Sequence, residues 1–118
     1  MKNEIKEIGK SVIELQIRAL KKLKYSLDES FEKAVKSIIK CKSKVIICGV
    51  GKSGIIASKI SATLSSVGTP SFSISASDCS HGDLGRITKN DILILISNSG
   101  NTSELSNIID YVKKNKIL

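Results

Sequence analysis

Residues 45–54 read VIICGVGKSG, and this segment indicates the class of fold. The short apolar run Val45–Cys48 predicts a strand that is buried on both faces of a sheet, because no polar residue alternates within it. The glycines that follow predict a tight turn at the carboxyl end of that strand. A helical pattern begins directly after the turn, at Ile55. A strand, a glycine turn and a helix in this order are typical of an α/β fold with a parallel sheet.

Two further strands are predicted downstream of this segment. Phe72–Ser75 has the weaker pattern, and Asp91–Ile96 (DILILI) is the clearest buried strand of the chain. The residues between them, 78–86, are polar and are expected to form a loop. Because a helical pattern links the first two predicted strands and another follows the third, we expect a mostly parallel sheet with right-handed crossovers.

The helix after the glycine turn is expected to span residues 55–67. It should end at Gly68, with Pro70 just beyond, because glycine closes helices well and proline cannot continue them. A last helix is expected over residues 102–114. The side chains expected to face the core from the first of these helices are Ile56, Ile60, Thr63, Leu64 and Val67.

The N-terminal part of the chain is predicted to be helical. Apolar residues recur every three or four positions between Asn3 and Tyr25, which predicts a long amphipathic helix. Ser26 and Glu29 have the spacing of a capping box, so a second helix is expected from Leu27 to about Lys40. We therefore divide the chain into an N-terminal helical segment, residues 1–43, and an α/β domain, residues 44–118.

The composition is that of a folded globular protein. The chain has 118 residues, of which 41% are hydrophobic and 25% charged, which excludes a disordered tail. No apolar run reaches the roughly 18 residues that a membrane span needs, and the first twenty residues lack the apolar core of a secretory signal. We therefore expect neither a membrane partner nor export. The three cysteines form no C-x-x-C pair, which argues against a disulfide framework or a zinc site and fits a reducing cytoplasm.

The net charge of +8 comes mainly from the N-terminal residues. Residues 1–44 hold twelve Lys or Arg and six Asp or Glu, whereas residues 45–118 hold seven and five. A basic excess can indicate nucleic-acid binding, but here no arginine cluster or interleaved aromatic residue supports it. We interpret the excess as a solvated, lysine-rich helix face and predict no nucleic-acid partner.

The glycine turn has the chemistry of an anion-binding loop. The glycines of residues 49–54 let the backbone approach an anion, and the following helix presents its N–H groups. The segment also matches G-x-G-x-x-G, so a dinucleotide-binding fold is an alternative. That fold needs an acidic residue near the end of the second strand, where only Asp78 in the next loop is available. A P-loop is excluded, because its first glycine would have to be at position 46, which is Ile46.

A second polar loop, residues 97–102, follows the last predicted strand and reads SNSGNT. Its three hydroxyl groups, with backbone N–H groups at a helix start, could hold a phosphate monoester. The alternative is that Ser and Thr only cap the last helix, but capping requires one such residue. The loop therefore favours phosphate binding.

Three segments together resemble the sugar isomerase (SIS) domain, and within it the D-arabinose 5-phosphate isomerases (the KdsD/KpsF family). They are GVGKSG at residues 49–54, HGDLG at residues 81–85 and ISNSG at residues 96–100. The resemblance covers nearly the whole chain. It implies a three-layer SIS-type fold with a mostly parallel sheet, incomplete here and preceded by N-terminal helices. The proteins that it resembles continue with further strands, catalytic Glu and His residues, and usually a pair of CBS domains.

The resemblance implies an aldose–ketose isomerase. Such enzymes interconvert D-ribulose 5-phosphate and D-arabinose 5-phosphate through a cis-enediol, and the product feeds Kdo synthesis for lipopolysaccharide or capsule. The reaction needs an acid and a base but no redox cofactor, so we expect no cofactor and no metal. A phosphorylated pentose is then the small-molecule partner. The alternative is a non-catalytic phosphosugar-binding SIS module.

The resemblance also assigns roles to individual residues. The catalytic positions that it implies are Lys52, His81 and Glu104. The positions that it implies for binding the substrate phosphate are Gly51, Ser53, Gly54, Ser97, Ser99 and Thr102. SIS proteins are typically oligomers, so we expect a homo-oligomer, with the apolar stripe from Ile5 to Leu23 as the candidate interface.

Overall fold

The computed structural model describes residues 2–80, 82–100 and 103–118. The chain forms two compact units, Met1–Lys36 and Ser37–Leu118. The domain boundary predicted between residues 43 and 44 is not tested by this division and stays a prediction.

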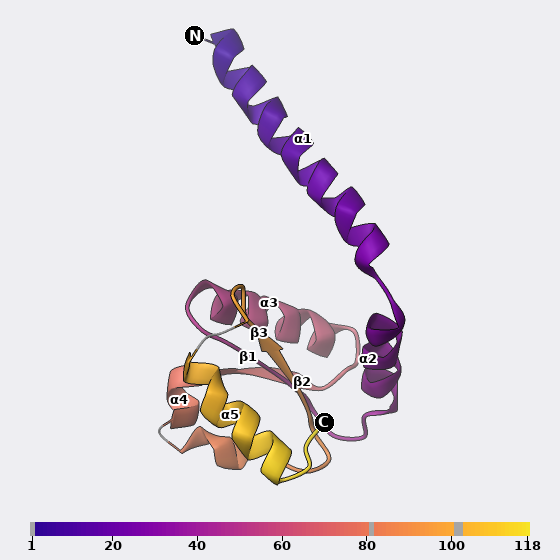
Figure 1. Ribbon diagram of the computed structural model, residues 1–118, viewed down its shortest axis with the longest axis vertical. Coiled ribbons are helices and arrows are strands. Elements are labelled where there is room, and N and C mark those ends of the chain that lie inside the picture. The colour runs from indigo at the N-terminus through magenta and orange to yellow at the C-terminus, as the bar shows by residue number, and fades with distance from the viewer. Residues whose placement is uncertain (1, 81, 101–102) are drawn as a thin grey trace. The chain divides into compact units, whose positions relative to one another are not determined.

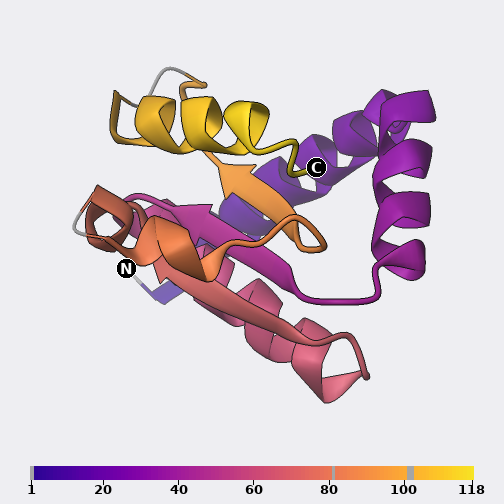
Figure 2. The same ribbon diagram turned by 90° about the horizontal axis from the view of Figure 1, so that it is seen from below.

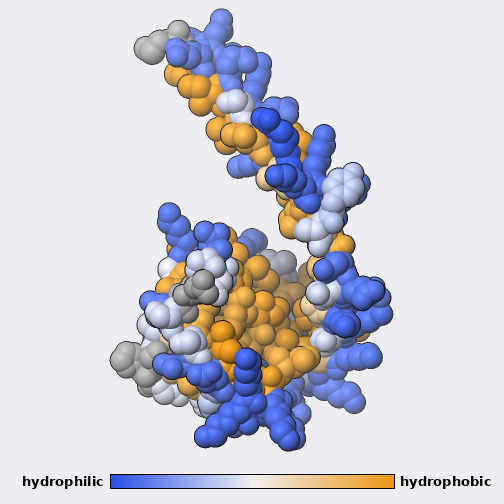
Figure 3. Space-filling view, in the orientation of Figure 1, coloured by the Kyte–Doolittle hydropathy of each residue, from blue (hydrophilic) through white to orange (hydrophobic). Residues whose placement is uncertain are grey.

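The first unit contains the long amphipathic helix that the sequence predicts. Helix α1 spans Lys2–Ser26 (Figure 1). None of its residues is buried. Its apolar side chains form a line along one side of the helix in Figure 3. In the part of the chain that the structure describes, no helix has the length and apolar character that would let it cross a membrane.

Helix α2, Glu29–Lys40, starts differently from the prediction. The expected capping box at Ser26 is wrong, because Ser26 lies within α1 and its hydroxyl donates to the Leu23 carbonyl at 2.7 Å. Asp28 caps α2 instead, and its carboxylate accepts from the N–H groups of Ser30 at 2.9 Å and Phe31 at 3.3 Å. A carboxylate at this position also has the charge that the positive end of a helix dipole favours.

The sheet of the second unit is parallel throughout and has the strand order β2-β1-β3. The strands are β1, Val45–Gly49; β2, Ser71–Ser75; and β3, Ile92–Ile96. β1 is the central strand and is buried at every residue, as its apolar run predicts. β3 begins one residue later than predicted and is less buried than expected, because it forms one edge of this sheet. Only its first residue, Ile92, is buried.

Alternate residues of β1 point into two separate cores, which gives the three predicted layers. Ile46 and Cys48 lie in the core with helix α5, Ser103–Lys114, which contributes Leu105 and Ile108. Val45 and Ile47 point to the other face, beneath helix α3, Lys52–Ser66. Figure 2 shows α3 and α5 on opposite sides of the sheet.

The side of α3 that faces the sheet is not the predicted one. Ala57 and Ser61 are buried, whereas of the five predicted side chains Leu64 is half-buried and the other four are exposed. Ala57 packs in the core with Val45 and Ile47. Small side chains let the helix approach the strand closely, and this close approach determines which side of the helix is covered.

The predicted end of α3 is confirmed. Gly68 has a φ of 97°, its N–H donates to Ser65, and the N–H of Thr69 donates to Leu64. This pair of hydrogen bonds is the Schellman arrangement, which requires a left-handed residue where glycine stands.

The expected loop over residues 78–86 is wrong, because the structure has two short helical turns there. They are α4, Ala76–Ser80, and the 3₁₀ turn η1, Asp83–Arg86. Ala76 and Cys79 are buried in the core beneath α5, so tertiary packing orders a segment whose sequence is mostly polar. The Arg86 guanidinium lies 4.6 Å from the centre of the Phe72 ring, which connects η1 to β2.

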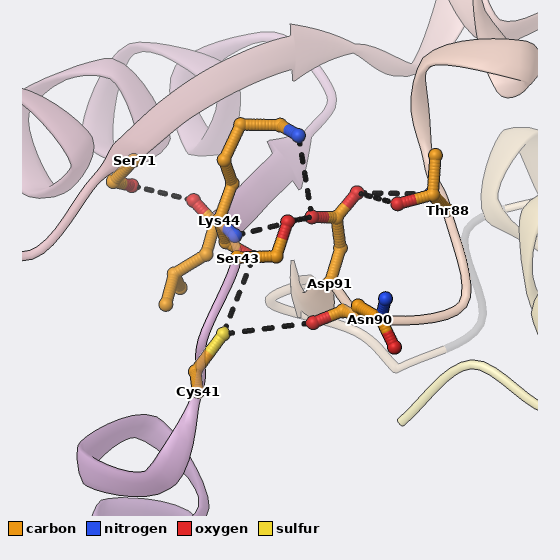
Figure 4. A network of polar contacts seen from close by, with 8 residues as sticks. Cys41, Ser43, Lys44, Ser71, Thr88, Asn90 and Asp91 are labelled. Atoms are coloured by element: carbon orange, nitrogen blue, oxygen red, sulfur yellow. Dashed lines mark hydrogen bonds and ion pairs between the residues drawn. The ribbon is translucent and has the colours of Figure 1, made fainter.

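A buried carboxylate joins the starts of β1 and β3. Asp91 is 2% exposed and accepts hydrogen bonds from Ser43, from the Lys44 N–H, and from both the N–H and the hydroxyl of Thr88, at 2.6–3.1 Å (Figure 4). The Lys44 ammonium lies 3.4 Å from the same carboxylate. Burial alone would raise the pKa of Asp91, but these hydrogen bonds outweigh it and hold the pKa well below its usual range.

Candidate functional site

The predicted binding loops lie at one edge of the sheet. Gly49, the last residue of β1, is in register with Ser75 at the end of β2 and with Ile96 at the end of β3. The glycine turn and the loop that begins at Ser97 therefore leave neighbouring strands at the same level. This edge is the usual place for ligands in open parallel sheets.

The glycine turn is held in close contact with β1. A Cβ atom on Gly49 would lie 2.6 Å from the Ser53 carbonyl carbon, so only glycine fits there. Gly51 has a φ of 59°, a conformation that glycine adopts without strain, and α3 begins at the next residue. The N–H of Ser53 donates to Val50 and that of Gly54 to Gly51. The turn thus sets the first N–H groups of α3 beside the end of the central strand.

A pocket of about 410 Å³ adjoins the glycine turn. Besides the three glycines of the turn, it is lined by Ser58, Ser73, Ser75 and Asp78. The Ser58 and Ser73 hydroxyls lie 3.0 Å apart. These serines are not among the site residues predicted from the sequence, although the position of Ser73 and Ser75 in a predicted strand was a signal that could have found them.

The second loop borders a separate pocket of about 370 Å³, which Ser97 and Gly100 line together with the start of α5. Gly100 has a φ of 74°, and its N–H donates to the Ser97 hydroxyl at 3.0 Å. Ser97 is half-buried, whereas Ser99 is exposed. This loop therefore combines hydroxyl groups with the positive end of a helix, which suits an anion.

The charged residues of the predicted site occupy the first turns of two helices. Lys52 is the first residue of α3, and Glu104 is the second residue of α5. Both side chains are exposed. The structure thus brings both to the carboxyl edge of the sheet. His81 and Thr102, which the sequence also assigns to the site, lie outside the described residues.

Two cysteines lie beneath this edge. Cys48 and Cys79 are both buried in the core under α5. Burial raises the pKa of the Cys48 thiol to about 12, and the adjacent Cys79 adds to the effect. A thiol that stays protonated is a poor nucleophile, so the burial of Cys48 argues against a role in covalent catalysis. Within residues 2–80, 82–100 and 103–118, no group of three or more His, Cys, Asp or Glu could hold a metal ion.

Comparison with protein families identifies one match. The SIS domain family matches residues 37–118 of the chain. This range coincides with the second compact unit of the structure, Ser37–Leu118.

Comparison with curated proteins finds arabinose 5-phosphate isomerases. The chain is 42% identical to the arabinose 5-phosphate isomerase KdsD of Yersinia pestis, over 98% of this chain and 35% of that protein. It is 51% identical to the KdsD of Francisella tularensis, over 84% of this chain and 31% of that protein. The chain therefore spans about a third of the length of these relatives.

Solved structures with the same fold include one with a bound ligand. The E. coli CFT073 protein c3406, in complex with arabinose 5-phosphate, has a TM-score of 0.72 and 46% identity, and the match covers 75% of this chain and 47% of that one. A Listeria monocytogenes protein proposed to be a sugar-phosphate isomerase has a TM-score of 0.74 and 38% identity, with coverage of 77% and 48%.

Proposed function

The chain belongs to the SIS domain family, and on that premise we propose that it is part of an aldose–ketose isomerase acting on a phosphorylated pentose. The proposed reaction interconverts D-ribulose 5-phosphate and D-arabinose 5-phosphate. The relatives that carry the name arabinose 5-phosphate isomerase, and the related structure in complex with arabinose 5-phosphate, support this choice of substrate.

The single observation that carries the proposal is the register of the two loops. Gly49 and Ile96 are paired neighbours, so the glycine turn and the Ser97–Gly100 loop leave the sheet side by side. Each loop leads into a helix, and the positive end of a helix dipole favours an anion. We assign the phosphate of the substrate to this edge, with Ser53, Ser97 and Ser99 as hydroxyl donors.

The proposed chemistry moves one proton between two neighbouring carbons of the sugar. A base removes the carbon-bound proton from C1 or C2 to form the enediolate and returns it to the other carbon, while an acid moves the hydroxyl proton between O1 and O2. Glu104 is our candidate for the base, because a carboxylate can both take and return the proton. Lys52 would stabilise the negative charge of the enediolate, since a fixed ammonium group is most valuable where charge develops. His81 remains a candidate for the acid.

The first experiment is an amide NMR titration of the chain with D-arabinose 5-phosphate. We expect saturable shifts confined to residues 49–54 and 97–104. D-Arabinose without its phosphate is the matched control and should produce no shifts at equal concentration. Equal shifts with both sugars, or none in these loops, would contradict the phosphate site. Binding without turnover in an isomerase assay would instead favour a non-catalytic phosphosugar-binding module.

Replacing Ser99 with alanine tests one phosphate contact. Ser99→Ala should weaken the binding of D-arabinose 5-phosphate at least about tenfold, because a hydrogen bond to a charged group contributes about 1.5–3 kcal/mol. Ser66→Ala is the control, since Ser66 is exposed at the far end of α3 and donates to the Thr63 carbonyl. If the two variants bind the sugar phosphate equally well, Ser99 does not contact the phosphate.

We also propose that the protein is a homo-oligomer that associates through α1. The apolar side chains of this helix are exposed, among them Leu15 at 60% and Leu20 at 64%, and contiguous apolar surface of this kind typically marks an interface. Leu15→Gln should raise the dissociation constant of the oligomer at least tenfold in sedimentation analysis. Glu14→Gln, on the polar side of the helix, should not. A monomeric wild-type chain would reject this interface.

The cysteines bear on where the protein is located in the cell. Cys41, Cys48 and Cys79 are all free thiols, which suits a reducing compartment, and we propose a cytoplasmic location. The proposed product would enter Kdo and lipopolysaccharide synthesis, as the resemblance implies.

A further inference from the structure

A larger pocket lies at the amino ends of the strands, which is the opposite end of the sheet from the proposed phosphosugar site. It has a volume of about 660 Å³, within the range of small-molecule sites. Asp91 and Ile92, where β3 begins, line it together with Lys40, at the end of α2, and Ser43. The pocket therefore adjoins the amino ends of the strands, whereas the glycine turn and the Ser97 loop follow their carboxyl ends.

The rim of this pocket is cationic. Three exposed lysines line it, namely Lys40, Lys42 and Lys89. Among the residues that the structure describes, the ion pairs include none of these three. The carboxyl end of α2 adds partial negative charge beside Lys40, which offsets part of one ammonium group. Lys42 and Lys89 lie outside the helices, in the segments before β1 and β3.

The carboxylate within the pocket does not neutralise the rim. Asp91 accepts four hydrogen bonds and pairs with Lys44, so its charge is already balanced (Figure 4). Leu118 also lines the pocket, and its main-chain oxygen accepts from the Leu93 N–H. The hydrogen bonds of Asp91 connect the floor of the pocket to Ser43, to Lys44 before β1 and to Thr88.

We propose that this pocket is a second anion site, which takes a small molecule carrying one or more phosphate groups. Lysine ammonium groups bind phosphate as point charges and need no fixed orientation, so three of them around one hollow can share a polyanion. The concave shape and limited volume favour a small phosphorylated molecule over a nucleic-acid backbone, which would follow an extended basic surface. The site is distinct from the proposed phosphosugar site and does not depend on it.

The test is an amide NMR titration of the full chain with inorganic pyrophosphate. We expect saturable shifts at residues 40–43 and 89–92, and a dissociation constant that rises with added salt, because exposed charges are screened. Shifts confined to residues 49–54 and 97–104 would mean that pyrophosphate binds only the opposite edge, and would overturn the proposal. The two sites are detected through different residues. A negative result at one site therefore does not affect the test of the other.

Charge-matched variants separate a specific pocket from general attraction. K40Q/K42Q/K89Q should weaken the binding of pyrophosphate at these residues at least tenfold. K59Q/K113Q/K114Q removes the same number of charges from lysines outside the pocket and should change binding less than threefold. Equal weakening in both variants would show non-specific attraction to a basic protein and would overturn the proposal. A double-stranded oligonucleotide that binds more tightly than pyrophosphate at the same residues would overturn the choice of ligand.

Discussion

Replacing Asp91 with alanine should lower the free energy of unfolding by about 3 kcal/mol, one of the two largest single-residue effects we expect. The variant would leave the Ser43 hydroxyl and the N–H groups of Lys44 and Thr88 without their buried acceptor. These donors lie at the starts of β1 and β3, so the loss separates the two strands at one end. Urea unfolding at neutral pH, followed by circular dichroism, measures the change.

The pH dependence gives an independent test of the same carboxylate. The pKa of Asp91 is lowered in the folded protein, so its contribution is fully present above the ordinary Asp value of about 3.9 and is lost as the pH falls through the folded pKa. The stability difference between the wild type and Asp91→Ala should therefore shrink below about pH 4. Asp110→Asn is the control, because Asp110 is exposed on α5 and should change stability by less than about 0.5 kcal/mol. A difference that stays constant with pH would contradict the role of the ionised carboxylate.

Replacing Gly49 with alanine should have a comparable effect, for a steric reason. The new Cβ would lie 2.6 Å from the Ser53 carbonyl carbon and 2.8 Å from the Gly54 nitrogen, and both are backbone atoms that cannot rotate away. The start of α3 must then move away from β1, at a cost of about 3 kcal/mol. The same movement should abolish the sugar-phosphate shifts at residues 51–54.

Gly85→Ala is the matched control for this substitution. A Cβ on Gly85 meets nothing within 4 Å, so the change should alter the free energy of unfolding by less than about 1 kcal/mol. If Gly49→Ala is too unstable to purify, the soluble expression levels of the two variants are compared instead. We then expect Gly85→Ala to be expressed at the wild-type level. Wild-type stability of Gly49→Ala would mean that the turn is looser than the structure has it.

Local sequence signals predicted the elements that local interactions determine. The run Val45–Cys48 predicted a strand buried on both faces, because an apolar segment without polar alternation has no side to turn to water. Gly68 predicted the end of α3, because a left-handed residue is needed to close the helix. The turn after β1 was also predicted from its glycines. The structure gives Gly51 a positive φ, a backbone conformation that favours glycine.

Other features depended on packing between distant segments. Ser26 and Asp28 could each have capped α2, and the choice depended on where α1 ends. Residues 78–86 were predicted to form a loop because the segment is mostly polar, yet Ala76 and Cys79 anchor the short helix α4 in the core. The apolar pattern of α3 predicted a helix but did not show which side of it faces the sheet. Ala57 and Ser61 face the sheet because they allow a closer approach to β1 than isoleucine does.

The strand–turn–helix order and the parallel α/β class could be predicted from the sequence, as could the polar loops proposed to bind phosphate, because each of these depends on residues close together in the chain. Which loops become neighbours depends instead on how the strands pair. Gly49 and Ile96 are brought level by hydrogen bonds between strands that are far apart in the sequence. The tertiary structure also decided the role of Asp91, since its partners Ser43 and Lys44 lie almost fifty residues away and assemble only when β1 and β3 pair. Long-range pairing of this kind has no local sequence signature, because the energy that selects it comes from the whole folded sheet.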